Sequence, residues 1–159
     1  MNEQEVMDYV AELAWRRSRT LVLVACVSQK LDCEAMACEL YVSDWFKKAR
    51  RYARVTGDMM ILSAEHGLVD PDDIIEPYDT TLNDMTHLER LQWAARVVAQ
   101  LEGLLAERKY DRVIVLAGRN YRDNLITYLD AKFGTNNVEV PLAGLGIGQQ
   151  KSKLMELCA

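Results

Sequence analysis

The residues best suited to chemistry follow directly after short apolar runs of the sequence. The first group combines a thiol, a hydroxyl and an amine in Cys26, Ser28 and Lys30, at the end of the apolar run 21–27. A lysine in such a place can hold an anion or, where water is excluded, act as a base or nucleophile. A solvated lysine beside a small buried cysteine is the structural alternative. Both interpretations of Lys30 stay open at the level of sequence.

A second group follows the apolar run 58–63 and continues into a polar loop. Ser63, His66 and Gly67 come first, and His66 could reach a ligand as a neutral imidazole, although a lone histidine is more often structural. Tyr78 and Asp79 then pair a ring that can stack on a base with a carboxylate that can accept a proton. Since so long a loop without secondary structure is uncommon unless functional, Asp79 is our candidate acid or base.

Glycines and side-chain amides mark the last two groups, which comprise Gly118 and Tyr121, then Gly144, Gly146, Gly148 and Gln149. The Gly-x-Gly-x-Gly spacing after the last apolar run is not a dinucleotide-binding fingerprint, because no strand–helix–strand unit follows it. It offers backbone amides that can approach a ligand closely, ahead of a helix N-terminus that favours negative charge. A flexible reversal of the chain is the alternative interpretation.

A dense basic run lies within one expected helix and consists of Lys47, Lys48, Arg50, Arg51 and Arg54. The simpler interpretation is a solvated helix face. The functional one is a patch that contacts the phosphates of a nucleic acid, together with Arg119 and Arg122.

Composition excludes several classes of protein. The chain has 159 residues, 50% of them hydrophobic and 27% charged, which is typical of one soluble globular domain. A formal net charge of −5, from 24 acidic and 19 basic residues, argues against non-specific binding driven by phosphates. The longest apolar run is far shorter than the ~20 residues of a membrane-spanning helix. We therefore expect no membrane association.

The N-terminus and the cysteines indicate a reducing compartment. Residues 1–5 are polar and acidic and lack the apolar core of a signal peptide, so we expect a cytoplasmic protein. The four cysteines, at positions 26, 33, 38 and 158, form no Cys-x-x-Cys pair, and the chain has only two histidines. Free thiols are expected, with no metal and no cofactor.

Apolar periodicity predicts strands that alternate with helices. Buried strands are expected over 20–27, 58–63, 111–117 and 137–140, and helices over 2–17, 33–55, 86–108, 120–132 and at the C-terminus. Asp32 should cap the second helix and Gly57 should end it, while Thr86 and Glu89 should form a capping box. Residues 69–83 are expected to form a polar loop. Gly118 is expected to precede and begin the helix over 120–132.

This order predicts a three-layer α/β/α fold with a four-stranded parallel sheet. We expect a single domain over 1–159, made of an N-terminal helix (1–19) and an α/β core (20–159). In such sheets ligands bind beyond the carboxyl ends of the strands. The groups described above follow these ends, so they are expected to meet at one edge of the sheet.

Several motifs together carry a resemblance. They are Cys26-x-Ser28-x-Lys30, Ala37-x-Glu39-Leu40-Tyr41-x-Ser43-x-x-Phe46, Leu62-Ser63-Ala64-x-x-Gly67-Leu68, Pro77-Tyr78-Asp79-x-x-Leu82, Leu116-Ala117-Gly118-x-x-Tyr121 and Pro141-Leu142-x-Gly144-Leu145-Gly146-Ile147-Gly148-Gln149. Over residues 20–155 this pattern resembles a widespread bacterial and phage family of unknown function. The resemblance places Glu39 among the ligand-binding residues.

Two further likenesses concern nucleic-acid chemistry. The segment from Cys26 to Lys30 resembles the Cys-Ser-x-x-Lys-Pro-Tyr motif of archaeosine synthase, a tRNA base-modifying enzyme, with Val27 inserted and without the Pro-Tyr. The expected fold is similar to uracil-DNA-glycosylase-like domains, although the chain lacks their Gly-Gln-Asp-Pro-Tyr motif. These likenesses imply that the ligand is a nucleobase or nucleotide, free or within DNA or RNA.

Three functions remain open on these grounds. The first is an enzyme that acts on a base or its N-glycosidic bond, with Lys30 or the glycine-rich loop binding a phosphate, Tyr78 stacking on the base and Asp79 activating water or another nucleophile. The second is a non-catalytic protein that binds a nucleotide or nucleic acid through the same pocket. The third is a protein-interaction module, such as a phage antagonist of a host defence enzyme.

Overall fold

A five-stranded sheet forms the centre of the computed structural model, which describes residues 1–159. The strands lie in the order β4 (Gly67–Val69), β3 (Asp58–Ser63), β1 (Thr20–Ala25), β6 (Arg112–Leu116) and β7 (Val138–Glu139). All neighbours are parallel except β3 and β4. The prediction of a four-stranded parallel sheet is therefore wrong in one respect, because a fifth, antiparallel strand forms an edge.

The extra strand exists because the chain turns back directly after β3. Residues 64–66 form a tight turn, and β4 then pairs Gly67 with Ser63 and Val69 with Ile61. Gly67 has a φ of 73°, a left-handed conformation that glycine adopts without strain. A Cβ atom at Gly67 would also lie 2.3 Å from Oε1 of Gln100. The turn thus depends on this glycine.

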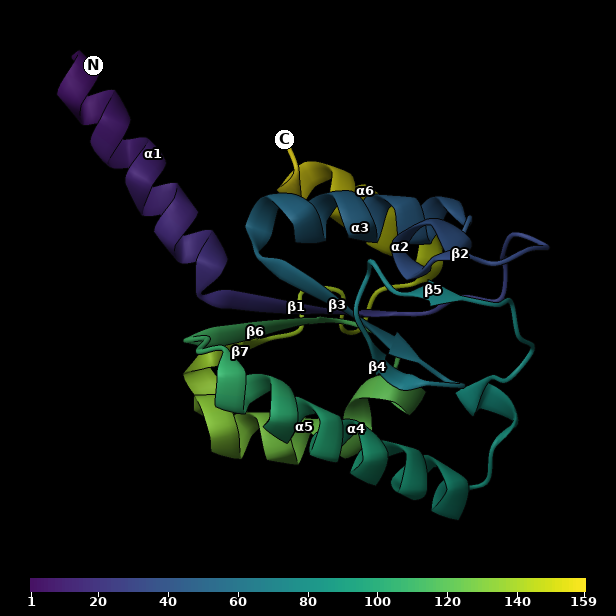
Figure 1. Cartoon of the computed structure of the whole chain (residues 1–159). Coiled ribbons are helices and arrows are strands. Elements are labelled where there is room, and N and C mark those ends of the chain that lie inside the picture. The colour runs from purple at the N-terminus through teal and green to yellow at the C-terminus, as the bar shows by residue number, and fades with distance from the viewer.

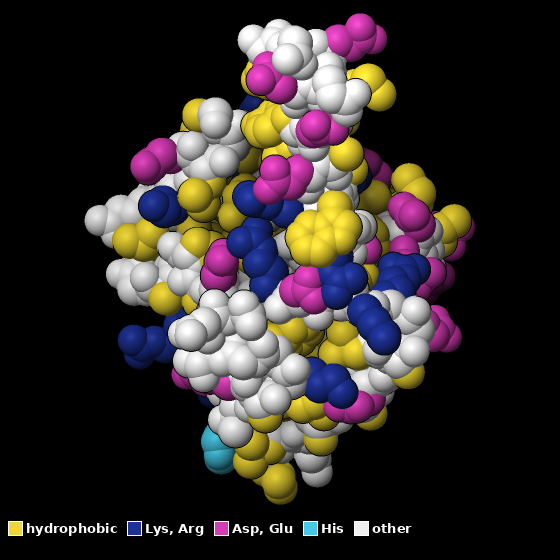
Figure 2. All heavy atoms as spheres, turned by 90° about the vertical axis from the view of Figure 1, so that its left-hand side faces the viewer, with side chains coloured by type: hydrophobic (Ala, Val, Ile, Leu, Met, Phe, Trp, Pro, Cys, Tyr) yellow, Lys and Arg dark blue, Asp and Glu magenta, His cyan; other side chains and the backbone are white.

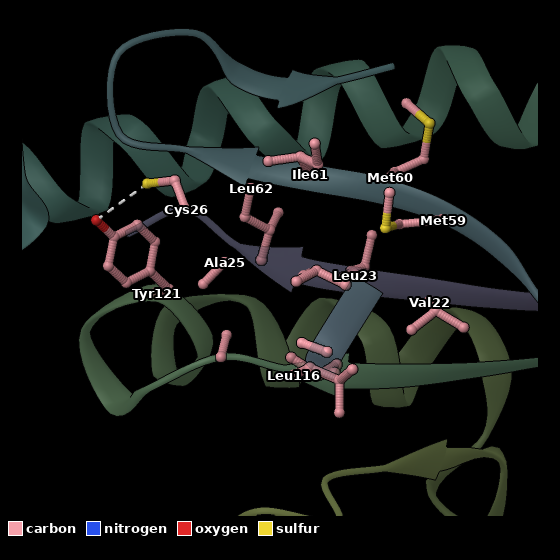
Figure 3. Packing of buried hydrophobic residues seen from close by; sticks show 14 of the residues in the cluster. Val22, Leu23, Ala25, Cys26, Met59, Met60, Ile61, Leu62, Leu116 and Tyr121 are labelled. Carbon is pink, nitrogen blue, oxygen red and sulfur yellow. Dashed lines mark hydrogen bonds between the residues drawn. The ribbon is translucent and has the colours of Figure 1, made fainter. Parts of the chain in front are cut away.

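The central strands are apolar because both faces of the sheet are covered. All six residues of β1 are buried, and five of the six residues of β3 are buried. Their side chains pack with those of β6 into one hydrophobic cluster that includes Leu23, Ile61 and Leu116 (Figure 3). Continuous apolar runs are typical of parallel strands that are buried in this way.

Helices form a layer on each side of the sheet (Figure 1). One layer contains α2 (Ala37–Leu40), α3 (Asp44–Thr56) and α6 (Ile147–Leu157), and the other contains α4 (His87–Glu107) and α5 (Arg119–Phe133). The three-layer α/β/α arrangement is confirmed. Similarity to uracil-DNA-glycosylase-like domains stays a prediction.

The single helix expected over 33–55 is wrong. The chain instead forms β2 (Ala35–Met36), the one-turn α2 and then α3, which Ser43 caps by accepting a hydrogen bond from the backbone N–H of Phe46. Asp32 caps no helix. The physical reason is a backbone bridge in which Lys30 and Tyr41 pair in antiparallel fashion, and this bridge holds the preceding segment outside the helix.

The expected polar loop over 69–83 contains regular structure. Strand β5 (Ile74–Ile75) pairs with β2, and a 3₁₀ turn, η1, covers Leu82–Asp84. Backbone carbonyls of Pro71 and Asp73 accept hydrogen bonds from Cys38 and Ala37 at 2.9 and 2.7 Å. The loop is thus fastened to the segment that replaces the expected helix.

The remaining helix boundaries agree with the sequence to within a few residues. Thr86 and Glu89 form the predicted capping box of α4, and Gly118 is the N-cap of α5. Gly57 ends α3, and a Cβ atom there would lie 2.3 Å from the carbonyl oxygen of Thr20. A second 3₁₀ turn, η2 (Thr135–Asn137), precedes β7.

The N-terminal helix α1 (Glu3–Ser18) extends away from the two layers (Figure 1). It has no buried residue. Asn2 and Glu5 form a capping box at its start. No helix of the protein combines the length and apolar character that crossing a bilayer requires.

Candidate functional site

A cavity of about 450 Å³ opens where β1 and β6 end. It is lined by Cys26, Val27, Ser28, Lys30, Asp79, Thr80, Thr81, Asn83, Asp84 and Tyr121. The residues after β1 form one wall, the loop that leads into η1 forms the second, and the first turn of α5 contributes Tyr121. The carboxyl ends of the strands thus bring together residues that lie far apart in the sequence.

Lys30 is held against aromatic rings in this cavity. Its Nζ atom lies 4.5 Å from the ring centroid of Tyr78 and 5.7 Å from that of Tyr41. It also donates a long hydrogen bond of 3.5 Å to the carbonyl oxygen of Ser28. Partial burial lowers the pKa of the Lys30 amine, and the nearby Cys26 and Asp79 side chains act in the opposite direction. The Lys30 amine is therefore held in place by the two rings, is partly shielded from water and has no fixed counter-ion.

A chain of hydroxyl groups supports the ring beneath Lys30. The phenols of Tyr41 and Tyr78 share a hydrogen bond of 2.5 Å, and Ser63 Oγ donates to the Tyr78 hydroxyl at 2.7 Å. Ser63 Oγ in turn accepts from the backbone N–H of His66 at 3.1 Å. Burial raises the pKa of Tyr41 to about 12 and also raises the pKa of Tyr78. Both phenols are therefore neutral at physiological pH.

The thiol of Cys26 lies at the inner end of the cavity. Its Sγ accepts a hydrogen bond from the backbone N–H of Ala64 at 3.4 Å and donates one to the Tyr121 hydroxyl at 3.5 Å (Figure 3). The ring of Trp93 meets Tyr121 edge-on at 5.6 Å, and its Nε1 donates to the carbonyl oxygen of Ser63 at 2.9 Å. Burial also raises the pKa of Tyr121. This end of the cavity is thus formed by packed aromatic rings, and the Tyr121 phenol there is neutral at physiological pH.

Asp79 supplies an exposed carboxylate at the mouth of the cavity. The loop that carries it is fixed directly after Asp79, because Thr80 Oγ1 donates to Glu65 and Asn83 Oδ1 accepts from Asn120 Nδ2 at 2.7 Å. The carboxylate can therefore meet a ligand with little rearrangement of its backbone.

Other predicted site residues shape the site without lining it. Tyr78 supports Lys30, and Ser63 supports Tyr78. The ring of exposed His66 meets Tyr78 edge-on at 5.6 Å, and His66 does not line the cavity. Gly67 starts β4 and Gly118 is the N-cap of α5, so both glycines have a structural role in the backbone.

The glycine loop and Glu39 do not line the cavity. Gln149 Oε1 accepts from the backbone N–H of Gly146 at 3.1 Å, which caps α6. Gly144 adopts a φ of 77° ahead of that helix. Glu39 forms ion pairs with Arg50 at 3.4 Å and Arg54 at 4.0 Å. Direct ligand contacts by these predicted residues, and by Gly148 within α6, thus have no support from the geometry.

The basic run of α3 is partly neutralised. Besides the ion pairs of Glu39, Lys48 pairs with Asp44 at 2.5 Å, and Arg50 donates to the carbonyl oxygen of Cys38 at 2.7 Å. Lys47 and Arg51 are exposed and have no acidic partner. This arrangement favours the solvated helix face and leaves these two cations for an external anion.

The sequence prediction missed part of the cavity wall. Thr80, Thr81, Asn83 and Asp84 line it because η1 begins there, with Thr81 Oγ1 accepting from the backbone N–H of Asn83 at 3.2 Å. The sequence signal that could have revealed this turn is the short polar group around Leu82, whose side chain is fully buried. Such a group is typical of a capped turn that is anchored by one apolar residue.

The site offers an amine, two carboxylates, hydroxyls, an amide, a thiol and one aromatic ring. No three His, Cys, Asp or Glu side chains lie together in a way that could hold a metal ion. The arrangement can bind a polar, ring-containing ligand with an anionic group near Lys30 and an electron-poor centre near Asp79.

Comparison with known proteins identifies the family. A model of a family of unknown function, DUF6884, matches residues 21–156, and the chain belongs to this family. The expectation of a family of unknown function over 20–155 is thereby confirmed. No curated protein and no solved structure matches the chain. The relation to archaeosine synthase and to uracil-DNA-glycosylase-like domains stays a prediction.

Proposed function

We propose that this protein is an enzyme that acts on a nucleobase or its N-glycosidic bond, in a nucleotide or a nucleic acid. One observation carries the proposal: the amine of Lys30 and the carboxylate of Asp79 line the same cavity at the carboxyl edge of the sheet. Parallel α/β folds place their ligands at this edge. The cavity, of about 450 Å³, also lies within the usual range of roughly 300–1,000 Å³ for small-molecule sites.

The two charges suit cleavage or exchange at the anomeric carbon. As the bond to the base breaks, positive charge develops on the sugar, and a carboxylate can stabilise it or take a proton from the attacking water. The water oxygen then bonds to the sugar carbon, and the base leaves with the bonding electron pair and receives a proton. Asp79 is the carboxylate in this proposal, and Lys30 binds a phosphate or the negative charge on the leaving base.

The aromatic neighbours divide the work of binding. One face of Tyr78 is occupied by Lys30, so Tyr78 positions the amine. Tyr121 lines the cavity and supplies the ring against which a base can lie. The Cys26 thiol beside the Tyr121 hydroxyl provides polar contacts for one edge of the base. Stacking, which the sequence assigned to Tyr78, is thus reassigned to Tyr121.

Ligand binding is tested first by thermal shift with bases, nucleosides, nucleotides and short oligonucleotides. Ligand at a hundred times its dissociation constant stabilises the fold by about 2.7 kcal/mol, which gives a measurable rise in Tm. The rise should disappear in Lys30→Ala and persist in Lys109→Ala, whose side chain is exposed and lies outside the cavity. An equal rise in both variants would exclude Lys30 from binding.

Turnover is tested by mass spectrometry of the stabilising ligand, with free base or altered nucleoside as the product. Asp79→Asn should lower the rate by about 10²–10⁴-fold, the usual contribution of a general base. Asp73→Asn is the matched control, since Asp73 is exposed and lies outside the cavity. Full activity in Asp79→Asn would refute the assigned role. Binding without product would replace the enzyme with a nucleotide-binding protein.

A further inference from the structure

Helix α1 is a surface that the proposed function does not use. It spans 16 residues, none of them buried, and it rises from the body of the protein (Figures 1 and 2). Figure 2 shows acidic and apolar side chains along the projecting part, with Lys and Arg side chains gathered where the helix meets the body. Its C-terminal end is fixed there, because Arg19 donates a hydrogen bond to Asp111 at 2.6 Å.

The apolar residues of α1 form one stripe. Val6, Val10 and Leu13 follow each other at intervals of four and three residues, and Met7 and Ala14 lie beside them on the same face. The side chains of Val6, Val10 and Leu13 are 44, 57 and 46% exposed. This spacing is that of a helix which packs along another helix, and no residue of the stripe is buried within the chain.

A partner would give this helix the stability that it lacks in isolation. Isolated helices shorter than about 12–15 residues are marginal in water, and α1, with 16 residues, is only slightly longer. In proteins most of the stability of a helix comes from packing of its apolar face. The capping box formed by Asn2 and Glu5 stabilises only the first turn. An exposed apolar stripe on an otherwise unsupported helix is therefore expected to pack against a partner.

The charges of α1 indicate what that partner is. The first half contains Glu3, Glu5 and Asp8. The last turn contains Arg16, which forms an ion pair with Glu12 of the same helix at 2.6 Å, and Arg17, which forms none. Two such helices side by side in parallel would oppose like charges. In the antiparallel orientation the acidic half of each helix lies against the basic end of the other. The helix is thus complementary to a second copy of itself.

We propose that two copies of this protein associate through an antiparallel pair of α1 helices. A two-fold axis at Val10 sets the register, because Glu3 and Arg17 each lie seven residues from it. Each Glu3 then faces the partner's Arg17, and each Leu13 packs beside the partner's Met7. The stripe is covered along its length, and its charges are paired at both ends.

Anionic partners suit this helix less well. A membrane surface or a nucleic acid would attract basic residues along the whole helix. The acidic first half of α1, in a chain of net charge −5, would be repelled. A second copy satisfies both the apolar stripe and the charge distribution.

Sedimentation equilibrium of the full chain tests the proposal. The mass should rise from 18.1 kDa towards twice that value as the concentration increases to about 500 µM, where even a Kd of about 0.1 mM gives mostly dimer. Val10→Glu should remain monomeric throughout. Ala11→Glu adds the same charge beside the stripe and should still form the dimer. Since Val10 and Ala11 are both exposed, both variants should keep the native thermal transition.

Charge reversal tests the antiparallel register. Glu3→Arg should weaken the dimer by at least fivefold, because each new arginine faces the partner's Arg17. Adding Arg17→Glu to the same chain restores opposite charges at both ends and should recover the affinity. A mass of 18.1 kDa at all concentrations would overturn the proposal. A dimer that survives Val10→Glu, or no rescue in the double variant, would do so as well.

Discussion

Removal of one hydroxyl group beneath Lys30 should destabilise the fold out of proportion to its size. The phenol of Tyr41 is only 1% exposed, and its hydrogen-bond partner is the hydroxyl of Tyr78. Tyr78→Phe keeps the ring that faces Lys30, but it leaves the Tyr41 hydroxyl without a partner and removes the acceptor of Ser63 Oγ. The variant therefore isolates the hydrogen-bond network from the packing of the ring.

The magnitude follows from the two groups affected. A buried hydroxyl without a partner costs about 1–3 kcal/mol, and a lost neutral hydrogen bond costs about 0.5–1.5 kcal/mol. Tyr78→Phe should thus lower the free energy of unfolding by about 2–4 kcal/mol. Tyr41→Phe should cost only about 1 kcal/mol, since the Tyr78 hydroxyl still accepts from Ser63. In the Tyr78→Phe background, Tyr41→Phe should cost nothing, because it removes the unpaired hydroxyl.

Urea unfolding of the two single variants and the double variant measures this coupling, which should be about 1 kcal/mol. All samples share one protein concentration, so that any self-association contributes equally. Tyr9→Phe is the control, because Tyr9 lies exposed on α1, and it should change the unfolding free energy by less than about 0.5 kcal/mol. If Tyr41→Phe costs the same in both backgrounds, the network does not act as described and Lys30 lacks this support.

Three further outcomes are expected from unfolding experiments. Since burial raises the pKa of Tyr41 to about 12 from 10.0, the unfolded chain loses this proton first as pH rises. The fold should therefore lose about 3 kcal/mol of stability through Tyr41 between about pH 10 and 12, and this contribution should be absent in Tyr41→Phe. Gly67→Ala should cost about 1–3 kcal/mol by strain at positive φ, with Gly148→Ala, which meets no atom within 4 Å, as a neutral or stabilising control in thermal melts. Thr86→Ala should cost about 1 kcal/mol in urea by removing the cap of α4, and an unchanged midpoint would contradict the capping box.

The parts of the fold that local sequence determines could be predicted. Strands β1, β3 and β6 are largely continuous apolar runs. The capping residues of α4 and α5 indicate where those helices begin. The local pattern of the sequence predicts one helix over 33–55 and does not reveal the error. The break in this helix comes from the bridge between Lys30 and Tyr41, which joins two segments by backbone hydrogen bonds that side-chain types do not indicate. Strand β4 has only three residues and depends on a turn at Gly67, which a short apolar run does not reveal.

The site was predictable where it depends on topology. Cys26, Ser28, Lys30 and Tyr121 follow β1 and β6, neighbouring parallel strands, so the rule for strand ends brings them together. The glycine loop follows β7 at the edge of the sheet, and its residues form the start of α6 instead of the cavity. Contributions from Thr80 to Asp84 depend on how a loop folds over the sheet edge, which residue types alone do not determine.

The motif around Tyr41 gains a physical explanation from this geometry. Ser43 caps α3, Phe46 lies 4.9 Å from the ring of Tyr41, and Tyr41 bonds to Tyr78. Each of these contacts is structural, yet together they fix the position of the Tyr78 ring over which Lys30 lies. Residues that never touch a ligand can therefore be as necessary for the site as those that do. Ser43→Ala should accordingly weaken ligand binding through Lys30 without changing any group in the cavity wall, and thermal shifts with the stabilising ligand would reveal it.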